Sequence, residues 1–223
     1  MKSKITLFVL TLFATTNTFA HTASNELSQQ QKNVKKVAQR VGAKTYLGKS
    51  KQNLEKPLQA IAWQESDFGK DIIGDCKHVR YYFKYNNKKI NVTLNKIYFK
   101  EGMPYTFYKE KEQKVYIYGG FKQLKNGSLG PFQVKVSTAK YLIQDMKLKQ
   151  YEYLLKNETM LIKKLLSDPE MGAILASEYL KVNYLEAQKN RCKDPLWRTI
   201  SRYNGGNNNT VYVKLITNKI AKL

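Results

Sequence analysis

Residues 78–121 differ in character from the rest of the 223-residue chain. They are rich in Tyr, Phe, Val and Ile, and Asn86-Asn87 stands between two of their apolar runs. This pattern predicts two to four short antiparallel strands, with a hairpin at Asn86-Asn87. Because the segments on either side have helical periodicity, we expect an α+β fold, mainly α, with a β-rich insertion at residues 75–125.

Helical periodicity begins near Asn33 and predicts a first helix to about Arg40, which Gly42 ends. A second helix is expected over 52–66, with Pro57 near its first turn, where proline does least harm. Beyond the insertion, the same periodicity predicts helices at 134–147, 149–166, 169–188 and 195–203 and one more at the C-terminal end.

The N-terminal end has the pattern of a secretory signal peptide. A basic start precedes the apolar run 5–14, and Thr18-Phe19-Ala20 forms a small-x-Ala site. The run is too short for an ordinary membrane span, although a retained anchor is the alternative. We expect cleavage after Ala20 and a periplasmic or secreted protein. The polar residues 21–32 would be a flexible lead-in, and 33–223 would form a single domain, because there is no internal repeat or long linker.

The chain carries 39 Lys and Arg against 17 Asp and Glu, a formal net charge of +22. Such a charge favours a polyanionic partner such as nucleic acid, anionic lipid or an acidic cell-wall polymer. Export argues against nucleic acid, and the basic residues accompany no nucleic-acid-binding motif. The alternative is an ordinary solvated lysine surface.

Two cysteines, Cys76 and Cys192, remain after the signal. In an oxidising compartment they predict one disulfide, which the chain-entropy model values at about 4–5 kcal/mol. Two buried thiols are the alternative. We expect no metal and no cofactor, because His21 and His78 are the only histidines and neither has a ligand partner at short spacing.

Glu65 stands where an apolar stripe predicts another apolar residue. Leu54, Leu58 and Ile61 follow one another at helical spacing, and Glu65 occupies the next position on that face. Desolvation on the buried side of a helix raises the pKa of a carboxyl group. A raised pKa keeps the acid protonated near neutral pH, as a general acid requires. The alternative is a glutamate at a helix end that points into solvent.

Four short segments follow one another in a recognisable order. They are Glu65-Ser66, Gly130-Pro131-Phe132-Gln133, Ala176–Leu180 and Tyr203-Asn204-Gly205-Gly206. In this order, the chain resembles the soluble lytic transglycosylase domain of the lysozyme-like superfamily. The resemblance covers residues 50–70 and 126–220. It implies a lysozyme-like fold, with the β-rich insertion lying between the catalytic helix and the Gly-Pro-Phe-Gln turn.

This resemblance implies an enzyme that acts on the glycan strands of peptidoglycan. A single glutamate, here Glu65, protonates the bond between N-acetylmuramic acid and N-acetylglucosamine and then acts as a base, which yields a 1,6-anhydro product. The matched positions Ser128, Gly130, Gln133, Tyr203 and Asn204 would then bind substrate. Gly130 would let the backbone approach a sugar, Gln133 would hydrogen-bond to it, and Tyr203 would orient Glu65.

Several alternatives stay open at this stage. Asp71 and Asp75 follow Glu65 and could support hydrolysis, as in a goose-lysozyme-like muramidase, although loop aspartates usually serve turns. A non-catalytic wall-binding or secretion-assembly protein is a second alternative. We expect a monomer with peripheral or no membrane association, and a secretion or conjugation apparatus is a further candidate partner. The C-terminal helix could also be membrane-active, but packing against its own domain is favoured.

Two departures from the family pattern concern the shape of the cleft. The insertion makes the spacing from Glu65 to Gly130 much longer than usual, and Pro131-Phe132 replaces Leu-Met in the turn. The insertion could form a wall or lid of the cleft or serve only as a structural subdomain. Glu178, on one of the matched segments, is expected to be a surface or salt-bridging residue and not a second acid.

Overall fold

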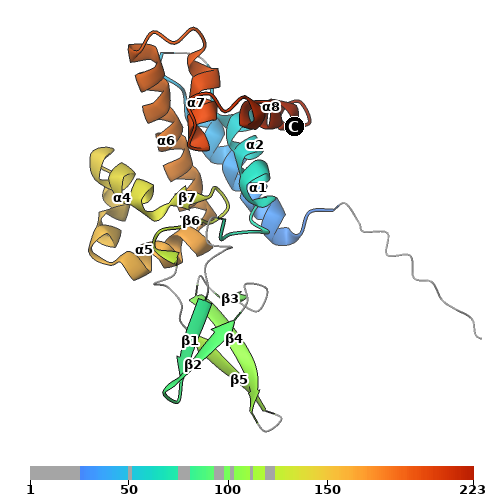
Figure 1. Cartoon of the computed structure of the whole chain (residues 1–223). Helices are drawn as coiled ribbons and strands as arrows, with labels where there is room; N and C mark the ends of the chain where they lie inside the picture. Colours follow the sequence, from blue (N-terminus) through green and yellow to red (C-terminus); the bar gives the residue numbers. More distant parts are fainter. Residues whose placement is uncertain are drawn as a thin grey trace, which may run out of the picture.

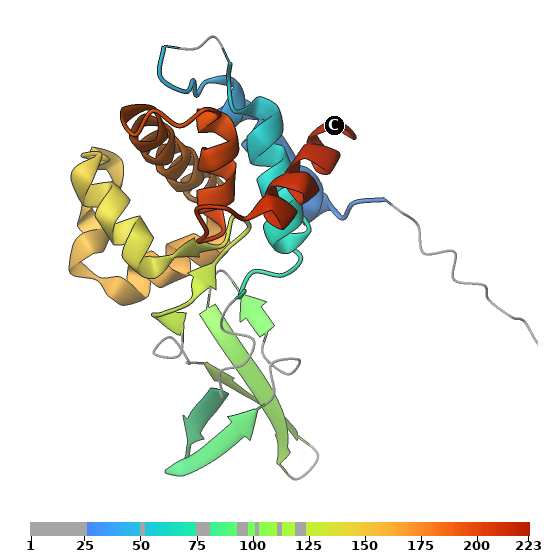
Figure 2. The ribbon, with the colours of Figure 1, turned by 45° about the horizontal axis from the view of Figure 1, so that its top comes forward.

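The computed structural model describes residues 26–49, 52–74, 81–92, 98–100, 103–110, 113–118 and 124–223. It has a mixed α+β fold that is mainly helical, as the sequence predicts. The helices and two short strands form one body, and strands β1–β5 lie to one side of it in both views (Figures 1 and 2). The helices are α1 (Gln29–Ala43), α2 (Glu55–Ser66), α4 (Val136–Asp145), the 3₁₀ helix η3 (Lys149–Lys156), α5 (Glu158–Ser167), α6 (Pro169–Lys189), α7 (Pro195–Tyr203) and α8 (Thr210–Ile220).

Helix α1 begins at Gln29, within the segment expected to be a flexible lead-in. Ser28 caps it, because its hydroxyl accepts from Gln31 N while Gln31 Oε1 accepts from Ser28 N. The helix also continues through Gly42 to Ala43, so Gly42 does not end it. A Cβ at Gly42 would lie 2.5 Å from the carbonyl oxygen of Leu54, so glycine allows the close approach to the start of α2.

Helix α2 packs its predicted apolar stripe into the core. Leu54, Leu58 and Ile61 are at most 1% exposed, and Pro57 lies in the first turn. The helix ends at Ser66, and Asp67, Phe68 and Gly69 follow with positive φ angles of 50°, 55° and 88°. These left-handed residues turn the chain sharply at the end of the helix that carries Glu65.

The described residues of the β-rich insertion form five strands, one more than the upper end of the prediction. They are β1 (Tyr81–Tyr85), β2 (Lys88–Val92), β3 (Tyr98–Lys100), β4 (Met103–Glu110) and β5 (Gln113–Tyr118). β1 and β2 form the predicted hairpin, and Asn86 and Asn87 turn it with φ angles of 45° and 61°. β3, β4 and β5 form a separate antiparallel sheet. With three residues, β3 is too short to show alternation in the sequence.

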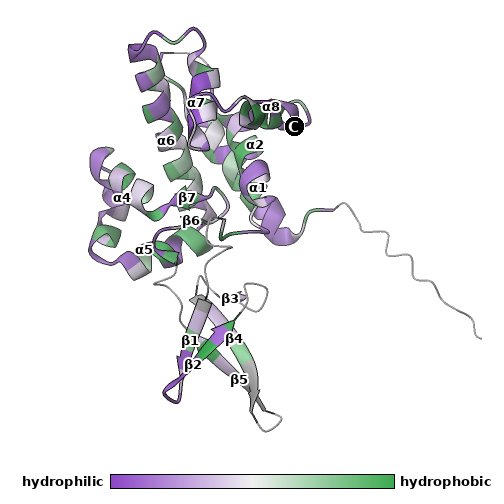
Figure 3. Cartoon of the chain, viewed as in Figure 1, coloured by the Kyte–Doolittle hydropathy of each residue, from purple (hydrophilic) through white to green (hydrophobic). Residues whose placement is uncertain are grey.

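The core lies between the helices. Figure 3 shows hydrophobic residues gathered along α2, α6 and α8. Ile61, Leu175, Leu180, Ile200 and Ile216 are examples from four helices, and each is at most 4% exposed. No helix in the described part of the chain is long and apolar enough to cross a membrane.

Candidate active site

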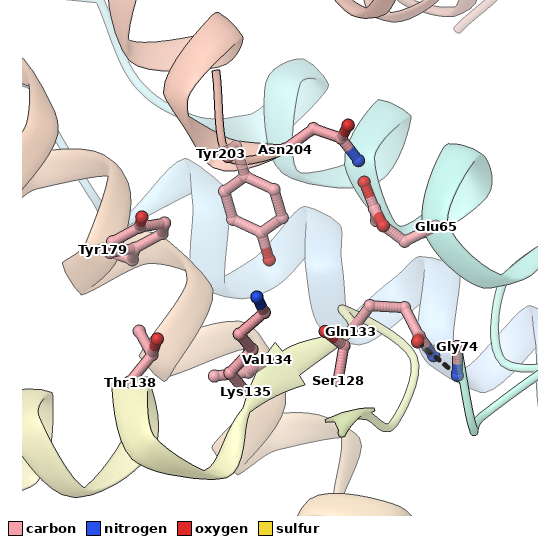
Figure 4. Close-up of a pocket in the computed structure, with 11 residues that line it drawn as sticks. Glu65, Gly74, Ser128, Gln133, Val134, Lys135, Thr138, Tyr179, Tyr203 and Asn204 are labelled. Carbon is pink, nitrogen blue, oxygen red and sulfur yellow. Dashed lines mark hydrogen bonds between the residues drawn. The ribbon is translucent and has the colours of Figure 1, made fainter. Parts of the chain in front are cut away.

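A cavity of about 340 Å³ lies where the four motif segments meet (Figure 4). It brings together Glu65, Ser128, Gln133, Tyr203 and Asn204 of the predicted site residues. These residues come from the end of α2, from the hairpin of β6 (Ser128–Leu129) and β7 (Val134–Lys135), and from the end of α7. Its remaining lining residues are Gly74, Val134, Lys135, Thr138, Tyr179 and Gly205.

Glu65 occupies the last turn of α2 and is partly buried, in line with its place at the end of the apolar stripe. It is the one carboxylate among the described residues that line the cavity. Its Oε1 accepts a 2.5 Å hydrogen bond from the hydroxyl of Tyr212 on α8. This contact holds the carboxyl group at the cavity wall in one orientation.

Tyr212, which the sequence analysis did not single out, donates to Glu65, and the predicted Tyr203 also lies within the electrostatic influence of this carboxyl group. The hydroxyl of Tyr203 donates to the carbonyl oxygen of Phe132 at 2.7 Å, and the centroid of its ring lies 5.7 Å from that of Tyr179. Burial, followed by the charge of Glu65, raises the pKa of both Tyr203 and Tyr212 well above 10. Both phenols therefore stay protonated beside the carboxyl group.

Tyr212 could have been suspected from its position in the sequence. It belongs to the buried side of α8 together with Val213 and Ile216, and this helix was expected from the periodicity. The pattern therefore indicates a buried tyrosine, but not its partner, because α2 and α8 meet only in the folded chain.

The loop between β6 and β7 is tied to its surroundings by side chains from two helices. The hydroxyl of Ser66 donates to the carbonyl oxygen of Pro131 at 2.6 Å and accepts from Gly69 N at 2.7 Å. Tyr203 holds the next carbonyl, that of Phe132, whose side chain is fully buried. Ser66, which follows the candidate acid, thus connects the end of α2 to this loop.

Gly130 does not line the cavity, where it was expected to let the backbone approach a sugar. It packs instead against the backbone of α5. Its φ is +76°, and a Cβ there would lie 2.1 Å from the carbonyl oxygen of Leu165 on α5. Its own N–H donates to the carbonyl oxygen of Ile72 at 2.9 Å. The glycine is therefore required by packing within the protein.

Gln133 lines the cavity, and its amide also braces the chain that follows α2. Its Oε1 accepts from Gly74 N at 2.6 Å, and its Nε2 donates to the carbonyl oxygens of Gly130 at 2.8 Å and Asp71 at 3.2 Å. Both amide hydrogens are thereby used within the protein. Gln133 consequently sets the position of residues 71–74 along the edge of the cavity.

Ser128 and Asn204 lie on different sides of the cavity. Ser128 is 8% exposed and sits opposite Lys135 in the β6–β7 hairpin. Asn204 is exposed just after α7 and accepts from Asn209 Nδ2 at 3.2 Å, so it also supports the turn toward α8. Lys135 is exposed and brings positive charge to the cavity, which sequence reasoning did not identify.

The remaining sequence predictions fall outside the cavity. Glu178 forms a salt bridge with Lys181 at 2.7 Å, one of the two expectations for it, and its side chain is 14% exposed. Asp71 lies outside the cavity lining and Asp75 outside the described residues. Cys192 follows the C-terminal end of α6 and forms no disulfide within the described residues. Its predicted partner, Cys76, lies outside them, so the disulfide stays a prediction.

Within the described ranges, no group of three His, Cys, Asp or Glu side chains is arranged to hold a metal ion. No family model, curated protein or solved structure matches the chain. The cavity thus offers one carboxyl group, held by a phenol, together with an amine and several polar groups from the hairpin and α7. Such a set can donate a proton to a bound group and later remove one.

Proposed function

We propose that the chain is a peptidoglycan lytic transglycosylase with a lysozyme-like fold and that Glu65 is its catalytic acid and base. One observation carries the proposal. Four segments that are far apart in the sequence, and that resemble the motifs of this family in their order, lie around a single cavity or in its supports. The carboxyl group at the cavity belongs to the glutamate that the motif designates.

The reaction needs one carboxyl group at two stages. Glu65 first donates a proton to the glycosidic oxygen as the bond to C1 of N-acetylmuramic acid breaks. The resulting carboxylate then removes the proton from the C6 hydroxyl of the same sugar, and that oxygen attacks C1. The product is the 1,6-anhydro sugar, and Glu65 regains the proton that it lost. Tyr212 would keep the carboxyl group in one orientation through both stages.

Hydrolysis by a muramidase is the alternative within the same substrate class. A second carboxylate usually serves such a reaction, either by activating water or by stabilising the sugar cation. Among the described lining residues, Glu65 alone carries a carboxyl group, which favours internal attack by the C6 hydroxyl over hydrolysis. A wall-binding or secretion-assembly protein without catalysis is the alternative from another class, but such a protein has no need for Glu65 in the cavity.

The proposal includes export to the periplasm or beyond, where peptidoglycan lies. It rests on the signal-peptide pattern of residues 1–20, which lie outside the described residues. The net charge of +22 suits a wall polymer that carries carboxylates on its peptides. A secretion or conjugation apparatus would be a partner if local opening of the wall is the role.

Mass spectrometry of the soluble products tests the proposal. The protein is incubated with purified peptidoglycan beside Glu65→Gln and a control, Glu178→Gln, which removes a partly buried carboxylate outside the cavity. We expect anhydro-muropeptides from the wild type and the control and at least about a thousandfold less from Glu65→Gln. Products with reducing ends would indicate a muramidase. Binding of the wall without any release would indicate a non-catalytic protein.

A further inference from the structure

The sheet β3–β4–β5 carries aromatic rings on one face. Tyr98, Tyr105 and Tyr118 lie opposite one another across the three strands, and Phe107 lies opposite Tyr116. We call these five residues the aromatic face. The rings contact one another, with centroids 5.5 Å apart for Tyr98–Tyr105 and 5.6 Å for Tyr105–Tyr118. They therefore form a continuous layer across the sheet.

This layer faces water, because the core of the β-rich insertion lies on the other side of the sheet. Thr106 and Ile117, which alternate with the rings along β4 and β5, are 1% and 6% exposed. Tyr116 and Tyr118, in contrast, are each 52% exposed. A sheet face that exposes aromatic rings to this extent is typical of a binding surface.

The chemistry of the layer suits a sugar chain. Four of the five rings are phenols, which combine a flat apolar surface with a hydroxyl at the edge. A pyranose ring has the matching features, with C–H groups on its face and hydroxyls around it. An exposed lysine, Lys100, lies two residues after Tyr98 on strand β3, and therefore on the same side of the sheet. Positive charge beside the rings suits the carboxylates of wall peptides.

The position of the insertion connects the aromatic face to the candidate active site. The chain enters the insertion after Gly74 and leaves it before Ser128, and both residues line the cavity. A cavity of about 340 Å³ accommodates a ligand of drug-like size, so a polymeric strand bound there must continue outside it. The insertion is therefore well placed to contact the next part of the strand.

We propose that the aromatic face binds a stretch of the peptidoglycan glycan strand beyond the cavity. The inference rests on the proposed function, from which it takes the substrate class. It adds a second contact region that would keep the enzyme on one strand. A single-stranded nucleic acid is the competing ligand, because bases also stack on exposed aromatic rings beside lysines.

The test measures binding separately from catalysis. Tyr116→Ala/Tyr118→Ala is made in the full-length Glu65→Gln protein, which leaves the wall intact, and binding to purified peptidoglycan is measured by co-sedimentation. Tyr46→Ala/Tyr153→Ala is the matched control, because each of these tyrosines is 51% exposed and lies outside the aromatic face. We expect binding to weaken about tenfold or more in the first variant and less than twofold in the control.

Two further measurements separate loss of the rings from loss of the fold. Thermal unfolding shows whether each variant is folded, and Tyr116→Phe/Tyr118→Phe, which keeps the rings, should retain most of the binding. Equal binding by the alanine variant and its control would overturn the inference. Tyrosine-dependent binding of a single-stranded oligonucleotide, with none of peptidoglycan, would also overturn it and assign the face to nucleic acid.

The outcomes distinguish this inference from the proposed reaction. If the wild type releases no sugar product but peptidoglycan binding depends on Tyr116 and Tyr118, the reaction is wrong and the glycan surface stands. If anhydro products form and peptidoglycan binding does not change when Tyr116 and Tyr118 are replaced, the reaction stands and the surface assignment is wrong.

Discussion

The hydroxyl of Tyr212 donates a 2.5 Å hydrogen bond to Glu65 Oε1, and the two residues are 147 positions apart in the chain. The contact joins α8 to α2 at the wall of the cavity. Because Tyr212 is 4% exposed, its hydroxyl has little access to water and depends on the carboxyl group for its hydrogen bond. The last helix of the fold therefore helps to orient the candidate acid.

Under the proposed function, replacing Tyr212 by Phe should reduce the rate of product release and leave the fold intact. The ring and its packing remain, but the hydrogen bond to Glu65 is lost. Hydrogen bonds to charged groups contribute about 1.5–3 kcal/mol, so we expect a decrease of roughly tenfold to a hundredfold in kcat. The measurement is the initial rate of anhydro-muropeptide release, with Tyr153→Phe as the control at an exposed tyrosine. An unchanged rate would show that Tyr212 does not position the acid.

Most helices of the fold could be predicted from the sequence, but the single helix predicted at 149–166 is wrong. The chain there forms η3 and then α5, because the side chain of Asn157 accepts from Met160 N and caps a new helix. The predicted boundaries of α7 agree with the structure, and those of α6 differ by one residue, because both helices begin with a proline after an aspartate cap. The prediction placed the start of α1 too late, because the apolar pattern contains only the buried residues of the helix, and these begin at Val34. The polar cap of Ser28 and Gln31 lies before them and contributes nothing to the apolar pattern.

The members of the candidate site could be predicted better than their roles. The motifs pointed to Glu65, Gln133 and Tyr203, and all three line one cavity. The structure adds contacts of these side chains that the motifs did not indicate. The hydroxyl of Tyr203 bonds to a backbone carbonyl, and the amide of Gln133 holds residues 71–74. Such contacts depend on where separate segments pack, which the local sequence does not specify.

Ser66→Ala should destabilise the protein more than an ordinary serine substitution. Ser66 is 3% exposed, and its removal leaves the Pro131 carbonyl and Gly69 N–H without the partner they have now. We expect a loss of about 2–3 kcal/mol in the free energy of unfolding, measured by urea denaturation. Ser167→Ala, at an exposed helix position, should cost less than about 0.5 kcal/mol. Similar losses for both variants would argue against the role of Ser66 as a connection between α2 and the loop.

Alkaline pH should weaken the folded state through the two buried phenols. The pKa of Tyr203 and Tyr212 lies well above 10 in the folded protein, whereas unfolded tyrosines ionise near 10. The folded state therefore binds more protons above pH 10, and its stability falls as pH rises through that region. Below pH 10 the contribution is fully present.

Each of these tyrosines should contribute a slope of up to about 1.4 kcal/mol per pH unit above pH 10. Urea denaturation of the wild type, Tyr212→Phe and the control Tyr153→Phe between pH 8 and 11 measures it. Tyr212→Phe should show a shallower decline, because the variant lacks one of the two phenols. If all three proteins decline in parallel, Tyr212 does not contribute to the pH dependence.

The two glycines Gly130 and Gly205 permit a comparison between strain and steric overlap. Both have positive φ angles, +76° and +79°, so alanine is strained at either position by about 1–2 kcal/mol. At Gly205 a Cβ would meet nothing within 4 Å, whereas at Gly130 it would lie 2.1 Å from the carbonyl oxygen of Leu165. Because a backbone carbonyl cannot rotate away as a side chain can, the β6–β7 loop or α5 must shift.

Gly130→Ala should therefore cost about 1–3 kcal/mol more than Gly205→Ala in the free energy of unfolding. Urea denaturation of both variants measures the difference, which is independent of any effect on activity. A shift of the β6–β7 loop would also disturb the contacts that Ser66, Gln133 and Tyr203 make with it. Equal destabilisation by the two substitutions would mean that the loop moves away from α5 at little cost, and that Gly130 is required only for its backbone conformation.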